Sequence, residues 1–199
     1  RAALRASAEG PLWIMFPMVG SLDDIRRAKE SLEQAKASLR LEGTPFDEQI
    51  KTGIMIEIPS IALVADLAAQ EVDFASIGTN DLCQYTMAVD RMSPGLRTYY
   101  QSLSPAMLRL LHGVISAFRA AGKPISVCGE MGGDPLAAAA LVGMGIQKLS
   151  MGSASIAKVK AALSQIRLHQ AEHAVEQAEA ARTETEARAI LSALLAQDA

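Results

Sequence analysis

The feature that most constrains the fold of this chain is a series of short apolar runs, each followed by a helical pattern. Every run ends in polar residues, Gly or Pro, and none alternates cleanly between apolar and polar positions. Strands without such alternation, separated by helices, predict a parallel sheet covered on its outer face. The expected fold is therefore α/β, with either a doubly wound sheet or a (β/α)8 barrel. The five runs are Leu12–Met18, Gly53–Ile58, Phe74–Ile77, Pro124–Val127 and Ile146–Met151.

Capping signals mark the helices between these runs. A start resembling a capping box at Ser21 opens a polar helix that reaches about Leu41. A second helix is expected over Pro59–Ala69, and Ser-Pro and Asp-Pro pairs start further helices after Ser104 and Asp134. The tail after these helices is rich in Ala, Glu and Gln, and we expect it to form solvated helices.

Composition and charge exclude several classes of function. A net charge of −3 without a basic cluster argues against nucleic acid as a partner. The apolar runs are too short and interrupted to span a bilayer, and no signal peptide precedes them, so no membrane insertion is expected. Cys83 and Cys128 lie far apart without Cys-x-x-Cys spacing. A disulfide or thiolate metal site is therefore not expected, and a cytoplasmic location fits.

Residues 74–91 form the stretch around which the rest is arranged. An apolar run leads into the turn Gly78-Thr79-Asn80-Asp81 and then into an expected helix whose far end supplies Arg91. Unpaired N–H groups and the helix dipole make such a turn suitable for phosphate. The plainer interpretation is a β-turn-α connection in which Asn80 or Asp81 caps the helix. Arg91 would either bind phosphate or pair with Asp90 or another acid.

Polar side chains follow the carboxyl ends of three of the expected strands. Glu57 ends the second run and Asp81 follows the third, so neighbouring strands, ~4.8 Å apart, would place both carboxylates on one rim. Two such oxygen ligands suit Mg²⁺, or alternatively Mn²⁺. Taken singly, Glu57 could instead cap a helix or pair with a lysine, and Asp81 could be a helix cap.

A third group, Cys128-Gly-Glu130, ends the fourth run. At a barrel rim the thiol could act as a nucleophile or a proton donor, because a thiol with a pKa of ~8.5 stays mostly protonated at neutral pH. Glu130 would support the site. The alternative for Cys128 is a small core residue, which is also our interpretation of Cys83. No catalytic role is assigned to the helical histidines, which are His112, His169 and His173.

Six segments occur in a recognisable order and spacing. They are Ile14-Met-Phe-Pro-Met18, Gly53-Ile-Met-Ile-Glu-Ile-Pro59, Asp73-Phe-Ala-Ser-Ile-Gly-Thr-Asn-Asp-Leu82, Gln84-Tyr85, Ala88-Val-Asp-Arg91 and Cys128-Gly-Glu130. As a set they resemble the C-terminal, phosphoenolpyruvate-binding domain of enzyme I of the bacterial phosphotransferase system, over Arg1 to Arg167. The dikinases share Gly-Thr-Asn-Asp-Leu and Cys-Gly-Glu. The first segment and the Gln-Tyr and Ala-Val-Asp-Arg segments favour enzyme I.

The resemblance implies a role for each site residue. Glu57 and Asp81 would hold the Mg²⁺ that bridges to phosphoenolpyruvate. Asn80 and Arg91 would bind the phosphate, and Cys128 would protonate the enolate to give pyruvate. The parent enzyme would pass the phosphate to its own histidine, in an N-terminal domain, and then to the carrier protein HPr.

The family barrel has eight strands, and the chain begins just before what resembles the fourth. We therefore predict a partial (β/α)8 barrel, strands 4–8 and their helices, in residues 1–166. Residues 167–199 would form a helical tail packed on the same domain. The open sheet edges predict a homodimer. A dikinase domain is the first alternative, and a catalytically inactive dimerisation or regulatory fragment is the second.

Overall fold

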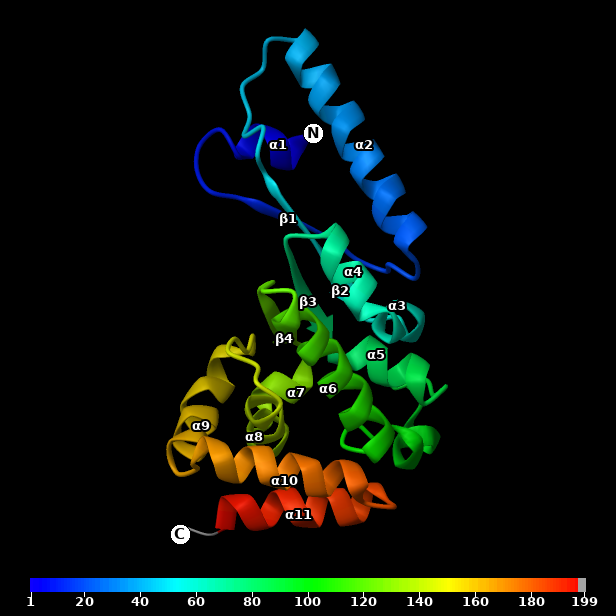
Figure 1. The fold of residues 1–199 in the computed structure, drawn as a ribbon, viewed down its shortest axis with the longest axis vertical. Helices are drawn as coiled ribbons and strands as arrows, with labels where there is room; N and C mark the ends of the chain where they lie inside the picture. Colours follow the sequence, from blue (N-terminus) through cyan, green and yellow to red (C-terminus); the bar gives the residue numbers. More distant parts are fainter. Residues whose placement is uncertain (197–199) are drawn as a thin grey trace.

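The computed structural model describes residues 1–196, and a parallel four-stranded sheet runs through its centre (Figure 1). The strands lie in chain order, β1-β2-β3-β4, and each pairs in parallel with the next. This order confirms the parallel α/β fold predicted from the apolar runs. The strands are β1 (Trp13–Phe16), β2 (Lys51–Ile56), β3 (Phe74–Gly78) and β4 (Ile125–Cys128).

Helices fill the connections, and the caps predicted at Ser21 and Ser104 are in place. The hydroxyl of Ser21 accepts from Asp24 N at 3.2 Å, and that of Ser104 accepts from Met107 N at 3.3 Å. The helices are α1 (Ala2–Ala6), α2 (Leu22–Leu41), α3 (Pro59–Leu63), α4 (Ala65–Glu71), α5 (Thr79–Thr86), the 3-10 helix η1 (Pro94–Tyr99), α6 (Pro105–Ala120), α7 (Glu130–Gly133), α8 (Pro135–Gly143), α9 (Ser153–Ser164), α10 (Leu168–Ala180) and α11 (Glu184–Ala196). Within residues 1–196, none of them is long and apolar enough to cross a membrane.

Two expected elements are interrupted. The fifth run forms no strand but a single parallel bridge between Val127 and Leu149. Val127 N donates to the carbonyl of Lys148 at 3.1 Å, and Ser150 N donates back to Val127 O at 2.8 Å. The ladder extends no further because β4 ends one residue beyond Val127. The expected helix after β2 is also broken, at Val64, whose φ of −118° and ψ of 34° separate α3 from α4.

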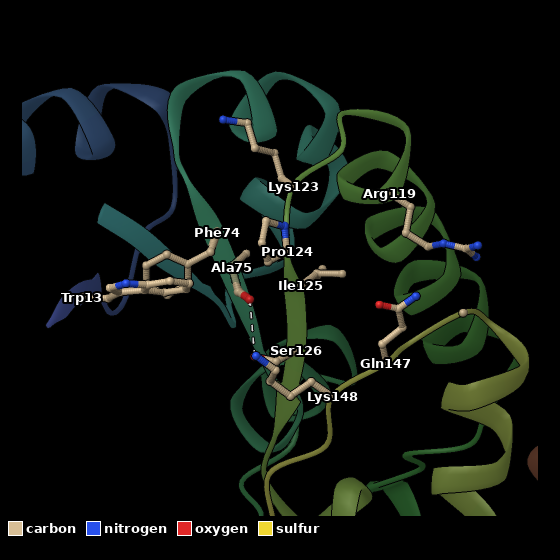
Figure 2. A pocket seen from close by; sticks show the side chains of 11 residues that line it. Trp13, Phe74, Ala75, Arg119, Lys123, Pro124, Ile125, Ser126, Gln147 and Lys148 are labelled. Carbon is tan, nitrogen blue, oxygen red and sulfur yellow. Dashed lines mark hydrogen bonds between the residues drawn. The ribbon is translucent and has the colours of Figure 1, made fainter. Parts of the chain in front are cut away.

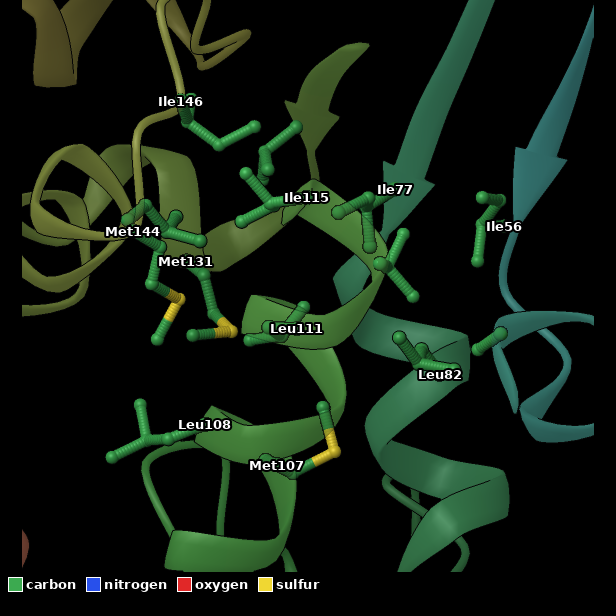
Figure 3. Packing of buried hydrophobic residues seen from close by; sticks show 14 of the residues in the cluster. Ile56, Ile77, Leu82, Met107, Leu108, Leu111, Ile115, Met131, Met144 and Ile146 are labelled. Carbon is green, nitrogen blue, oxygen red and sulfur yellow. The ribbon is translucent and has the colours of Figure 1, made fainter. Parts of the chain in front are cut away.

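The main core lies between the sheet and α6 (Figure 3). Ile56 and Ile77 project from neighbouring strands on this side, and Leu111 and Ile115 project from α6; all four are fully buried. Met131 of α7 enters the same core with 5% of its surface exposed. This side chain anchors the turn that follows β4.

The C-terminal helices are less solvated than we expected. Helix α10 buries Ala171 and Val175, and α11 buries Leu191. A Cβ on Gly143 of α8 would lie 2.5 Å from the carbonyl oxygen of Ala171, so the glycine permits close contact between α8 and α10. The core therefore extends into the tail, because its Ala-rich faces pack against α8. Residues 197–199 of the predicted tail lie outside the described residues.

The other face of the sheet carries aromatic side chains at the amino ends of its strands (Figure 2). The rings of Trp13 and Phe74 lie side by side, with centroids 5.0 Å apart. A Cβ on Gly53 would lie 2.6 Å from the Phe74 ring, so this glycine makes room for the ring on the strand between them.

Candidate functional site

Three residues from neighbouring strands form one row at the carboxyl end of the sheet. Gly78 pairs with Cys128, and Glu57 comes directly after Ile56, whose partner is Ile77. Glu57 therefore lies beside Gly78, with Cys128 on the other side. Because Gly78 has no side chain, the Glu57 carboxylate can lie directly against β3, where a Cβ would be 3.1 Å from Oε2.

Glu57 is a buried carboxylate with one unused oxygen. Only 4% of the residue is exposed, and Oε1 accepts from Met18 N at 2.7 Å. Oε2 has no hydrogen-bond partner among residues 1–196. Glu57 does not cap the next helix, whose N-cap is Ile58, and it forms no ion pair within the described residues. The second oxygen keeps its lone pairs for a ligand.

Asn80 and Asp81 lie within the first turn of α5, which corrects the expectation that one of them caps the helix. The N-cap is Gly78, and it makes no side-chain capping bond. The helix also ends at Thr86, short of Arg91. The chain instead turns back, because Arg91 N donates to Gln84 Oε1 at 3.1 Å.

The partner of Arg91 is Asp81 rather than Asp90. Arg91 Nη2 lies 3.4 Å from Asp81 Oδ1, and about a third of each side chain is exposed. An ion pair this long and exposed contributes little stability, so both side chains are available to a ligand. The structure thus brings the predicted phosphate-binding arginine next to one of the predicted metal ligands.

Asn80 joins two of the motifs found in the sequence. Its Oδ1 accepts from the backbone N–H of Glu130 at 3.0 Å. Since only the oxygen of the amide can accept, Nδ2 keeps both of its N–H donors, and neither has a partner among the described residues. The hydrogen bond connects Gly-Thr-Asn-Asp-Leu on β3 and α5 with Cys-Gly-Glu after β4.

The Cys-Gly-Glu turn is held against α5 by its backbone. Thr79 Oγ1 donates to the carbonyl of Cys128 at 3.1 Å, and Cys128 Sγ donates to Ile77 O at 3.4 Å. Gly129 has a φ of 102°, and a Cβ there would lie 2.6 Å from Thr79 Oγ1. Glycine is required here, and it places the half-buried Cys128 thiol at the rim.

Two hollows meet at Asn80 and Glu130. The first is formed with the loop between α5 and α6, and its lining includes Arg91, Arg97 and Tyr100. The second extends toward the amino end of α9, and its further lining includes Asp134, Ser150, Ser155 and Lys158. The site is thus open to a small charged molecule on both sides of the Asn80 amide.

Another hollow lies at the amino ends of the strands, around Trp13, Phe74 and Lys148 (Figure 2). It is at the opposite end of the sheet from the row of Glu57 and Cys128. Parallel α/β proteins place their reactive groups at the carboxyl ends of strands, so we assign no chemistry to it.

Within residues 1–196, no three His, Cys, Asp or Glu side chains are arranged to hold a metal ion. Glu57 and Asp81 are the two carboxylates predicted to hold a cation, which would take its other ligands from water and substrate. This donor set suits Mg²⁺, which usually keeps several waters and binds through one or two carboxylates and a phosphate.

Comparison with known proteins places these residues in a family. Residues 1–168 match the family described as PEP-utilising enzyme, PEP-binding domain, where PEP is phosphoenolpyruvate. The chain belongs to the PEP-utilising enzymes. This confirms the family that the six segments indicated.

Two curated relatives of the chain carry the same name. The chain is 51% identical over 160 residues to a phosphoenolpyruvate-protein phosphotransferase of Priestia megaterium, and 52% identical over 160 residues to that of Staphylococcus carnosus. Each alignment covers 80% of this chain and 28% of the relative. The chain thus spans little more than a quarter of the length of these PEP-utilising enzymes.

A solved structure supports the fold. A citrate lyase from Burkholderia xenovorans LB400 superposes with a TM-score of 0.55 and 22% sequence identity. The match covers 96% of this chain and 65% of the other. The architecture of this PEP-utilising domain is therefore similar to that of the lyase.

Proposed function

We propose that this chain is the phosphoenolpyruvate-binding part of a phosphoenolpyruvate–protein phosphotransferase. The observation that carries the proposal is the hydrogen bond between Asn80 and Glu130, which joins the two motifs at the carboxyl end of the sheet. The names of the curated relatives support it and favour it over a dikinase. The sheet would form strands 4–7 of a (β/α)8 barrel, with residues 146–151 at the position of the eighth.

The phosphate of phosphoenolpyruvate would bind at the amino end of α5. The Nδ2 donors of Asn80 face no other described group, and the first N–H groups of the helix lack intrahelical partners. Arg91 would add a guanidinium, which can hold two phosphate oxygens at once. Positioning and charge neutralisation supply most of the rate in phosphoryl transfer, so these donors would be central to activity.

Glu57 and Asp81 would hold Mg²⁺ beside the phosphate. The ion, when bound, would neutralise charge on the phosphate and carboxylate of the substrate. Gly78 would let the carboxylate keep its position, since a Cβ there would lie 3.1 Å from Glu57 Oε2. Met18 N would fix the other oxygen and so determine which one is presented.

Cys128 would complete the reaction on the pyruvate side. As the phosphoryl group moves to a histidine, the P–O bond of phosphoenolpyruvate breaks and the enolate of pyruvate remains. The Cys128 thiol would give its proton to the methylene carbon, and the thiolate would regain a proton from solvent. The accepting histidine would belong to the N-terminal domain of the parent enzyme, which then passes the phosphate to HPr. The parent would be a cytoplasmic homodimer.

Proton exchange into pyruvate tests the proposal without the histidine domain. The chain is incubated in D₂O with pyruvate, Mg²⁺ and inorganic phosphate, and deuterium entering the methyl group is followed by NMR. We expect exchange with the wild type and none above background with Cys128→Ala. Cys83→Ala is the matched control and should retain exchange. Equal exchange in Cys128→Ala, or none in the wild type, would contradict the proposal.

A further inference from the structure

The loop between α5 and α6 folds back over the amino end of α5 and is fastened there by two side chains. One is Arg91, which pairs with Asp81. The other is Tyr100, which comes directly after η1 and donates from its hydroxyl to the carbonyl of Asn80 at 3.2 Å. Both contacts reach the first turn of α5, where the candidate phosphate site lies.

Tyr100 differs from its neighbour Tyr99 in its exposure and in its side-chain hydrogen bonding. Tyr99 is 62% exposed and makes no side-chain hydrogen bond within residues 1–196. Tyr100 is half-buried and lines the hollow shared by Asn80, Arg91 and Glu130. The Tyr100 phenol is protonated at neutral pH and can donate, and burial raises its pKa further.

Asn80 is therefore held at two points by different segments. Tyr100 contacts its main-chain carbonyl, and the N–H of Glu130 contacts its side-chain oxygen. The first contact fixes the main chain of Asn80, and the second fixes the oxygen of its side-chain amide. Neither the family motifs nor the spacing of the sequence assigns a role to Tyr100.

We propose that Tyr100 is a positioning residue for Asn80. The phenol fixes the first turn of α5, and the Asn80 amide then presents its two N–H donors to an anion in the hollow. The identity of that anion as the phosphate of phosphoenolpyruvate rests on the proposed function. The positioning of Asn80 by Tyr100 does not depend on the proposed function.

The first arm of the test needs no ligand. Tyr100→Phe removes only the hydroxyl and keeps the ring, and Tyr99→Phe makes the same change one residue away. The ¹⁵N–¹H signal of the Glu130 amide, which donates to Asn80 Oδ1, is compared in the two variants. We expect it to shift in Tyr100→Phe and to stay in place in Tyr99→Phe. An unmoved Glu130 signal in Tyr100→Phe would overturn the proposal.

The second arm measures binding of phosphoenolpyruvate with Mg²⁺ by calorimetry. Loss of one hydrogen bond should weaken binding by about threefold to tenfold in Tyr100→Phe. In an Asn80→Ala background the same change should have no further effect, since the phenol acts through Asn80. Additive losses in the double variant, or unchanged binding in Tyr100→Phe, would overturn it. If the wild type binds no phosphoenolpyruvate, the proposed function fails, and the Glu130 amide still decides whether Tyr100 positions Asn80.

Discussion

The carboxylate of Glu57 lies directly against Gly78: a Cβ on that glycine would be 3.1 Å from Glu57 Oε2. It would also lie 3.1 Å from Glu57 Cβ and from Met55 Sδ. The φ of Gly78 is −83°, which any residue adopts, so the backbone does not demand glycine here. What glycine provides is the close approach of β3 to the carboxylate oxygen proposed to hold the cation.

Gly78→Ala should therefore affect the metal more than the fold. The added methyl group must move the Glu57 carboxylate, and we expect Mg²⁺ to bind about tenfold more weakly in the presence of phosphoenolpyruvate. Calorimetric titration of Mg²⁺ measures this. Gly113→Ala is the control, because a Cβ there meets nothing within 4 Å. Equal Mg²⁺ affinity in both variants would show that the carboxylate has no role in metal binding.

Glu57→Gln separates the charge of this residue from its structural contact. Glutamine keeps an oxygen that can accept from Met18 N, so the free energy of unfolding should change by less than about 1 kcal/mol. Mg²⁺ affinity should fall at least about tenfold, because a hard cation loses an anionic ligand. Thermal unfolding and calorimetry give the two quantities, with exposed Glu9→Gln as the control for net charge. Retained Mg²⁺ affinity would refute the assignment.

Gly129→Ala should open the Cys-Gly-Glu turn. Both the φ of 102° and the contact with Thr79 Oγ1 oppose a side chain, and we expect a loss of about 2 to 3 kcal/mol in the free energy of unfolding. Gly43→Ala is matched to it, since Gly43 also has a positive φ, 67°, but open space around it. The free energy of unfolding of Gly43→Ala should fall by about 1 kcal/mol. Denaturant unfolding measures both, and equal losses would show that the contact with Thr79 is unimportant.

Alkaline pH should destabilise the protein through Cys83. Burial raises the pKa of this thiol from 9.0 to about 11. The protonated thiol is favoured in the folded state, so its stabilising contribution is complete below pH 9 and is lost as the pH rises to about 11. The expected loss is about 2 to 3 kcal/mol. Denaturant unfolding at pH 8 and pH 11 should show this extra loss in the wild type relative to Cys83→Ala. Identical losses in the two proteins would contradict the prediction.

The strands and helix starts were predictable because their signals are local. Ser21 and Ser104 cap helices through contacts within three residues. The apolar runs end at polar residues, Gly or Pro that directly follow them in the sequence. The edge of the sheet was not predictable, because Leu149 pairs only at one position. The tail was expected to pack on the domain but to be more solvated than it is, because small residues such as Ala171 pack closely only where a glycine of α8 faces them.

The residues of the site were predictable from the motifs, but their contacts were not. Glu57 is held by Met18, which is 39 positions away, and Asn80 is held by Glu130, which is 50 positions away. The return of Arg91 to Asp81 depends on the helix ending at Thr86, and no cap or proline marks that end in the sequence. Tyr100 carried no signal because its hydroxyl reaches a main-chain carbonyl, a contact that no motif describes.

The most direct test of the account is calorimetric titration of phosphoenolpyruvate, with Mg²⁺ present, into the wild type and Asn80→Asp. Aspartate keeps an oxygen to accept from Glu130 N–H but replaces the two Nδ2 donors with negative charge facing the phosphate. We expect binding by the wild type and at least about a hundredfold weaker binding by the variant, since a donor is lost and a like charge is added. Equal binding by both proteins would contradict the account, because the phosphate would then lie away from the turn after β3.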